Sequence, residues 1–224
     1  MKRGVWLGFV LTVLLAGFSG VVWGQSLEDS YKEGGQRYSR SDFQGALQAW
    51  QHGLTLARAT ENRQAEVAFL GGLGVVYTAL GNYPQALRFL DQALQGAREL
   101  RNRAVEGEVL THLGVEGVML NNLGNVYQAL GDYPQALRFY EQALQIRHEL
   151  KDRAGEGANL NNLSGVYEAL GNYPQALRFL EQALQLDREL KDRAGEGIVL
   201  NNLGNVYTAL GNYPQALRFL DQAL

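Results

Sequence analysis

The stretch NNLGNVYQALGDYPQALRFYEQAL, residues 121–144, returns almost unchanged at residues 161–184 and 201–224. Its Y-P-Q-A-L-R-F motif also occurs earlier, so prolines recur at spacings of 50, 40 and 40 residues, at Pro84, Pro134, Pro174 and Pro214. A weaker relative, SDFQGALQAW at residues 41–50, stands 40 residues before GNYPQALRFL. A unit repeated at a period of 20–50 residues is typical of a solenoid. The sequence therefore predicts five stacked copies of one unit.

Each copy reads as two helices joined by a tight turn. In the third copy, Leu120, Leu123 and Tyr127 recur at intervals of three or four residues, which is the apolar stripe of an amphipathic helix. Gly131 is placed to end this helix in a left-handed conformation, and Asp132 is placed to cap the next one. Pro134 falls within the first turn of the second helix, where a missing N–H does no harm.

The spacing L-G-x-x-Y, G-N/D-Y-x-x-A and a following aromatic residue or leucine resembles the tetratricopeptide repeat. The 40-residue period resembles the form found in kinesin light chains and in bacterial multi-repeat proteins. The resemblance implies an all-α, right-handed superhelical solenoid of antiparallel helix pairs. We expect a degenerate first repeat at 27–66, repeats at 67–104, 117–156 and 157–196, a partial duplicated helix at 105–116, and a truncated repeat at 197–224.

Two departures from the repeat pattern have structural consequences. In the first copy, Arg37 replaces the tyrosine of L-G-x-x-Y and Gly53 replaces the second alanine, as suits a terminal repeat. Between the second and third copies, VEGEVLTHLG is followed at once by VEGVMLNNLG. Ten residues do not complete whole helical turns, so one helix cannot bury Leu110 and Leu120 alike. We expect an overlong helix with a kink or break near residues 114–117, and a weak point there.

An amide-rich face is the candidate binding site. On a helical wheel, Asn121, Asn122, Asn125 and Gln128 lie on one face, opposite the apolar stripe. In the resembled family this face of the first helix lines a concave groove, and related solenoids use such asparagines to hold the backbone of an extended peptide. An amide offers donors and an acceptor to peptide groups. The predicted groove residues are Asn121, Asn122, Asn125, Gln128, Asn161, Asn162, Asn201, Asn202 and Asn205.

A plainer interpretation of the asparagines stands beside this one. Residues 157–184 and 197–224 are identical at 22 of 28 positions, which indicates recent duplication. Matching asparagines in such copies count as one observation that has been copied, and a solenoid stabilised by packing between neighbours tolerates them without any ligand. In the fourth copy Gly165 interrupts the second row of amides, and in the second copy Gly72 and Val75 interrupt both rows.

Composition limits the remaining function classes. The formal net charge is −3 and there is no cysteine, which argues against a nucleic-acid surface, disulfides and thiolate chemistry. We predict no cofactor, no metal and no catalytic residues. Residues 1–24 carry a basic start, an apolar run and small residues before Gln25, the pattern of a secretory signal peptide. The chain is thus expected to be exported, to a periplasm or outside the cell, or else to be anchored in a membrane by residues 4–23.

Three functions follow as expectations. The first is a non-catalytic scaffold that binds a protein partner, as an extended peptide segment, in the concave groove. The second is the regulatory or substrate-recruiting array of a larger enzyme, such as a CHAT-type peptidase, with a catalytic domain beyond this chain. The third is an array that associates with itself through an apolar face at its C-terminal end.

Overall fold

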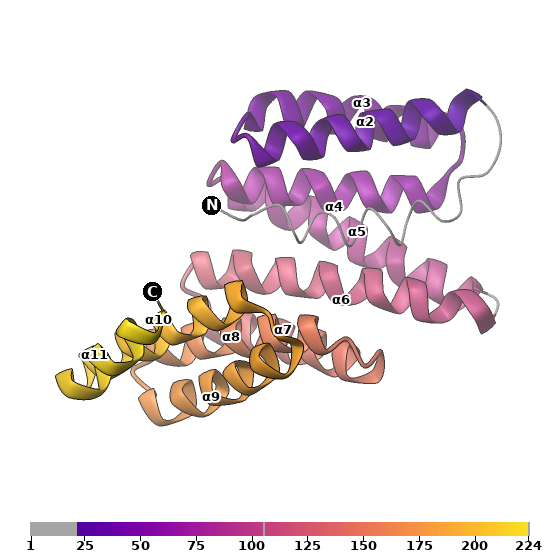
Figure 1. Cartoon of the computed structure of the whole chain (residues 1–224). Helices are drawn as coiled ribbons and strands as arrows, with labels where there is room; N and C mark the ends of the chain where they lie inside the picture. Colours follow the sequence, from indigo (N-terminus) through magenta and orange to yellow (C-terminus); the bar gives the residue numbers. More distant parts are fainter. Residues whose placement is uncertain (1–21, 105, 224) are drawn as a thin grey trace. The chain divides into compact units, whose positions relative to one another are not determined.

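The computed structural model describes residues 22–104 and 106–223, and this part of the chain folds into ten α-helices and contains no strand (Figure 1). The predicted leader lies outside the described residues, except for its last three, which begin α2. The first helices of the five copies are α2 (Val22–Ser39), α4 (Arg63–Ala79), α6 (Glu106–Ala129), α8 (Arg153–Ala169) and α10 (Arg193–Ala209). The second helices are α3 (Phe43–Ala59), α5 (Tyr83–Arg103), α7 (Tyr133–Glu149), α9 (Tyr173–Leu190) and α11 (Tyr213–Gln222).

The helices form two compact units, which divide between Val126 and Tyr127, near the end of α6. Within the units, α4 packs on α5, α8 on α9, and α10 on both α9 and α11. Among the helices of the described residues, none is both long and apolar enough to cross a lipid bilayer. The prediction of an all-α array of helix pairs is confirmed.

The turns within and between copies follow the local rules that the sequence indicated. Gly131 has a φ of 77°, and the Asp132 side chain accepts a hydrogen bond from the Gln135 N–H at 3.2 Å, so the glycine turn and the cap are both confirmed. The return turns that lead into α8 and α10 use lysine in the left-handed region, with φ of 54° at Lys151 and 57° at Lys191. An aspartate then caps the following helix. A glycine costs less than a lysine in that conformation, so the return turns hold some strain.

The first copy departs from the repeat pattern because aromatic residues fill its core. Trp50 is fully buried over Gly34, in the place that leucine takes over the corresponding Gly74 of the second copy. A Cβ at Gly53 would overlap the Phe69 ring, so the missing alanine makes room for that ring. The degenerate repeat is therefore packed around different residues.

The long helix α6 carries the duplicated segment without a break. It runs for 24 residues, continuously through residues 114–117, so the expected break there is wrong. The wheel argument itself is confirmed, because Leu110 is 63% exposed whereas Leu120 is 1% exposed. Glu116 is buried in the middle of α6, where it accepts a hydrogen bond from Arg98 of α5 at 2.8 Å and forms an ion pair with Arg101 of α5 at 2.6 Å. These contacts support the segment where a break was expected, since they fix α6 against α5.

The second unit repeats one core arrangement from copy to copy. Between α7 and α8 the core contains Tyr140, Leu163 and Val166, and between α9 and α10 it contains leucines and valines of the same positions. In each copy the tyrosine of the first helix stacks on the phenylalanine of the second, with centroids 5.3 Å apart for Tyr127 and Phe139. This regular core places the first helices α8 and α10 at a fixed spacing, which positions the candidate site.

Candidate functional site

An amide–amide hydrogen bond links the first helices of the last two copies. The Asn202 Nδ2–H of α10 donates to the Asn161 Oδ1 of α8 at 2.8 Å. Asn161 and Asn202 are both half-buried, so this bond lies partly within the array. At this rung the asparagines hold neighbouring helices together, a role that neither interpretation of the asparagines predicted.

Other predicted residues of the second unit reach the surface to different extents. Asn162 on α8 is half-buried, whereas Asn201 and Asn205 on α10 are exposed. Since Asn202 donates across to α8, the Asn162 and Asn202 positions lie on adjacent helices. The structure thus brings together a short row of amides on two neighbouring first helices.

Gln128 supports the core of its own copy. Its Oε1 accepts a hydrogen bond from the Tyr140 hydroxyl at 2.7 Å, and burial raises the pKa of that fully buried tyrosine. A buried hydroxyl left without a partner is costly, so this bond stabilises α7 against the end of α6. The third copy alone combines glutamine here with tyrosine in place of leucine, a signal in the sequence that could have identified the pair.

The same glutamine gives a reason for the glycine that interrupts the second row of amides. A Cβ placed on Gly165 would stand 3.3 Å from the Gln128 Nε2. An asparagine at residue 165 would therefore require Gln128 to move. The interruption at Gly165 makes room for the neighbouring side chain.

The predicted residues of the first unit are less exposed than the helical wheel indicated. Asn121 is 6% exposed, and Asn122 and Asn125 are half-buried. The wheel considers one isolated helix, whereas first helices in an array lie against each other, as α2 lies against α4 and α8 against α10. The flank on which Asn121 lies is therefore not free surface, and the wheel placed it wrongly.

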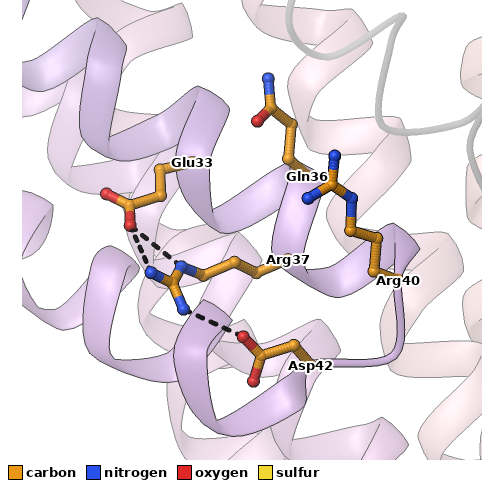
Figure 2. Close-up of a pocket in the computed structure, with 5 residues that line it drawn as sticks. All are labelled: Glu33, Gln36, Arg37, Arg40 and Asp42. Carbon is orange, nitrogen blue, oxygen red and sulfur yellow. Dashed lines mark hydrogen bonds and ion pairs between the residues drawn. The ribbon is translucent and has the colours of Figure 1, made fainter.

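A polar hollow of about 320 Å³ lies where α2 turns into α3 (Figure 2). Arg37 spans it, and its guanidinium bonds to Glu33 Oε1 at 2.9 Å and to Asp42 Oδ2 at 3.0 Å. The pKa of the Asp42 carboxyl is lowered, first by its hydrogen bond from the Gly45 N–H and then by Arg37. These exposed charges satisfy one another and cap α3, so the hollow has a structural explanation.

The described residues contain no group of three or more His, Asp or Glu side chains arranged to hold a metal ion. The candidate site in the second unit consists of amides and one carboxylate, Glu168 on α8. Such side chains can form hydrogen bonds with peptide groups and with charged side chains.

Known proteins supply the context for this architecture. Sequence models of the tetratricopeptide repeat match residues 116–189 and 157–224, and a second such model matches residues 68–103. Together these matches cover more than half of the chain. Among curated protein sequences, none matches it.

Solved structures of low sequence identity share the fold. BtubC (BKLC) from P. vanneervenii is 19% identical with a TM-score of 0.70, over 91% of this chain and 90% of that one. A kinesin light chain of Podosopora anserina with nearly identical TPR-like repeats is 20% identical with a TM-score of 0.68, over 88% and 92%.

A Rap protein complexed with competence and sporulation factor is 17% identical with a TM-score of 0.70, and this chain spans 65% of its length. At such identities the likeness shows the fold alone. The sequence matches, the repeated turns and caps, and the stacked helix pairs agree, and the chain belongs to the tetratricopeptide repeat family.

Proposed function

We propose that the protein is an interaction scaffold that binds an extended segment of a partner protein along α8 and α10. The observation that carries this proposal is the amide row of Asn162, Asn202 and Asn205 on two adjacent helices. The leucine and valine core shared by α8, α9 and α10 holds these helices at a fixed spacing, so the row is organised before any ligand arrives. Preorganised groups lose less entropy on binding.

The chemistry of the row suits a peptide backbone. Each asparagine side chain has two N–H donors and an oxygen acceptor, so it can pair with a peptide C=O and N–H whatever the side chains of the segment. The Rap protein of similar fold was solved with a bound factor, which supports the use of this architecture for recognition. The predicted leader, residues 1–24, would deliver the array to a periplasm or the exterior, and export is part of the proposal.

The test removes the amides without removing the array. The partner is first identified by pull-down from the exported fraction of the host and then titrated with purified protein. We expect the Asn162→Ala/Asn202→Ala double variant to bind it at least about tenfold more weakly, since each lost hydrogen bond is worth about 1 kcal/mol.

Asn161→Ala is the matched control, because it breaks the rung but leaves Asn162 and Asn202 in place. We expect it to lower the melting temperature slightly and to bind the partner nearly as well as the wild type. Unchanged affinity in the double variant would contradict the proposal. An equal loss in Asn161→Ala would mean that the amides act through packing alone.

A second candidate function is self-association, favoured by apolar side chains at the surface of the last copy. Tyr213 and Leu217 of α11 are 63% and 62% exposed, and Ile198 of α10 is 55% exposed. Side chains of this kind gathered on one helix pair mark contact surfaces. In this proposal the occupant is a second copy of the chain.

Light scattering over a concentration series tests self-association. We expect the average mass to rise with concentration, and the Leu217→Lys variant to remain monomeric. Gln222→Lys adds the same charge at another exposed position of α11 and should associate as the wild type does. A wild-type chain that stays monomeric at high concentration would rule this function out.

A further inference from the structure

The residue after the tyrosine of L-G-x-x-Y in the first helix is threonine in the second and last copies, glutamine in the third and glutamate in the fourth. Thr78 and Thr208 each donate their hydroxyl to a backbone carbonyl four residues back, of Gly74 and Gly204, at 2.8 Å. Gln128 accepts from the Tyr140 hydroxyl. In these three copies the polar side chain is satisfied by its own helix pair.

The fourth copy places a carboxylate at this position and removes the donor. Glu168 takes the place of Gln128, and Leu180, which is fully buried, takes the place of Tyr140. Glu168 is half-buried, and within the described second unit its carboxylate has no hydrogen bond or ion pair. Burial raises the pKa of this carboxyl, in keeping with a charge that lacks a nearby cation.

The other first-helix glutamates of the second unit are all paired. Glu156 bonds to Arg153 at 2.9 Å and to His148 at 3.0 Å. Glu196 bonds to Arg188 at 2.8 Å and to Arg193 at 3.3 Å. These pairs lie at the N-terminal ends of α8 and α10, whereas Glu168 lies near the C-terminal end of α8. At 1.5 Å per residue, Glu168 is about 20 Å along α8 from the pairs of Glu156.

The arginine of the adjoining second helix is engaged elsewhere. Arg178 of α9 donates to the Gln175 Oε1 at 3.0 Å, and its guanidinium lies 4.5 Å from the centre of the Phe179 ring. Glu168 lies two turns along α8 from Asn161, on the flank where Asn161 accepts a hydrogen bond from Asn202 of α10, beside the amide row. The row thus continues into a single carboxylate that no side chain of the second unit neutralises.

We propose that Glu168 receives a cationic side chain, Lys or Arg, from the segment that binds along α8 and α10. This inference rests on the proposed function and adds charge selection to it. The amides hold the backbone whatever the sequence, whereas a carboxylate at one end of the row admits a positive residue at one place. A charge-assisted bond in a partly desolvated setting is stronger than a neutral one, so this contact would set both register and specificity.

A displayed library of random 12-residue peptides tests the inference directly, because the selection requires no identified partner. Selection on the full chain is expected to enrich Lys or Arg at one fixed position. Selection on the Glu168→Thr variant should abolish that enrichment. Threonine is the residue that the last copy carries at this position, as Thr208. Glu181→Thr removes an equal charge from an exposed position of α9 and should leave the enrichment intact.

Titration of one selected peptide sharpens the test. We expect Glu168→Thr to weaken its binding by about tenfold or more, and replacement of its Arg by Gln to weaken binding equally. When the Glu168→Thr protein is titrated with the Gln peptide, the two losses of binding free energy should not add, because both changes remove the same contact.

The outcomes separate the two proposals. If the library yields no binding peptide at all, the groove function fails and this inference fails with it. If peptides bind without enrichment of a cation, or if the enrichment survives Glu168→Thr, the groove stands and the inference about Glu168 is overturned.

Discussion

Replacing Trp50 with alanine is expected to unfold the first helix pair, at a cost of about 3–5 kcal/mol, the range for truncating a large buried aromatic residue. Trp50 is fully buried, and its indole Nε1–H donates to the Tyr31 carbonyl oxygen at 3.2 Å. Its ring centroid lies 6.1 Å from that of Tyr31 and 6.2 Å from that of Tyr38. Alanine would leave a cavity over Gly34 and remove the hydrogen bond from the indole to α2, and the two helices cannot collapse to fill the cavity.

Hydrogen exchange measured along the chain checks this expectation. Amides of α2 and α3 should lose protection in Trp50→Ala, whereas those of α8 and α9 should keep it, because a repeat contacts only its neighbours. Trp50→Leu is the matched control. It installs the residue found at the same place in the second copy and should cost clearly less. Full protection of α2 and α3 in the alanine variant would contradict the assignment of Trp50 as the centre of this copy.

Arg147 and Asp187 occupy equivalent positions in two copies but carry opposite charges. Placing each side chain in the other's position is expected to change the free energy of unfolding in opposite directions. Arg147, 2% exposed, pairs with Asp152 at 2.7 Å across the turn from α7 to α8. The same place in the next copy holds Asp187, which is 8% exposed and faces Asp192 and Glu196 instead. Arg147→Asp should destabilise the second unit by about 3 kcal/mol, as expected when one partner of a buried pair is lost. Asp187→Arg should stabilise it.

The pH dependence of stability distinguishes this explanation from simple packing. Burial, and then Asp192 and Glu196, raise the pKa of Asp187 to about 6, above its ordinary value of 3.8. The folded state then holds the proton more tightly than the unfolded state does. Its stabilising contribution is complete below about pH 4 and is lost as the pH rises through about 6.

Thermal or urea unfolding between pH 4 and pH 7.5 measures this contribution. We expect the wild type to lose about 2 kcal/mol over that interval relative to Asp187→Asn, since one unit of pKa corresponds to 1.36 kcal/mol. Identical pH profiles for the two chains would show that Asp187 is solvated and that the charge exchange acts through size alone.

Features governed by a few consecutive residues could be predicted from the sequence. The glycine turn at Gly131, the cap at Asp132 and the proline in the first turn depend only on local backbone geometry, and the structure has each of them. The recurrence of one helix pair in each copy followed from the period. The all-α array was therefore predictable in outline from the repeat and its local signals.

Features that depend on the neighbouring helix could not be predicted in the same way. The Asn161–Asn202 bond joins residues 41 positions apart, and a wheel drawn for one helix cannot show which flank its neighbour covers. The continuity of α6 depends on the arginines that reach Glu116 from α5. That the amide row binds a ligand remains a prediction. The wheel also could not show that Asn205 is exposed whereas Asn162 and Asn202 are half-buried.

The left-handed turns at Lys151 and Lys191 have a consequence for the history of the gene. Each is followed by an aspartate that caps the next helix, so the chain has the same local geometry at both ends of residues 152–191. In-frame recombination that removed this segment would join Lys151 to Asp192 and keep every helix boundary. It would also bring Arg147 opposite Asp192 and discard Asp187. The matching turns therefore allow the gene to gain or lose a whole copy without interrupting any helix.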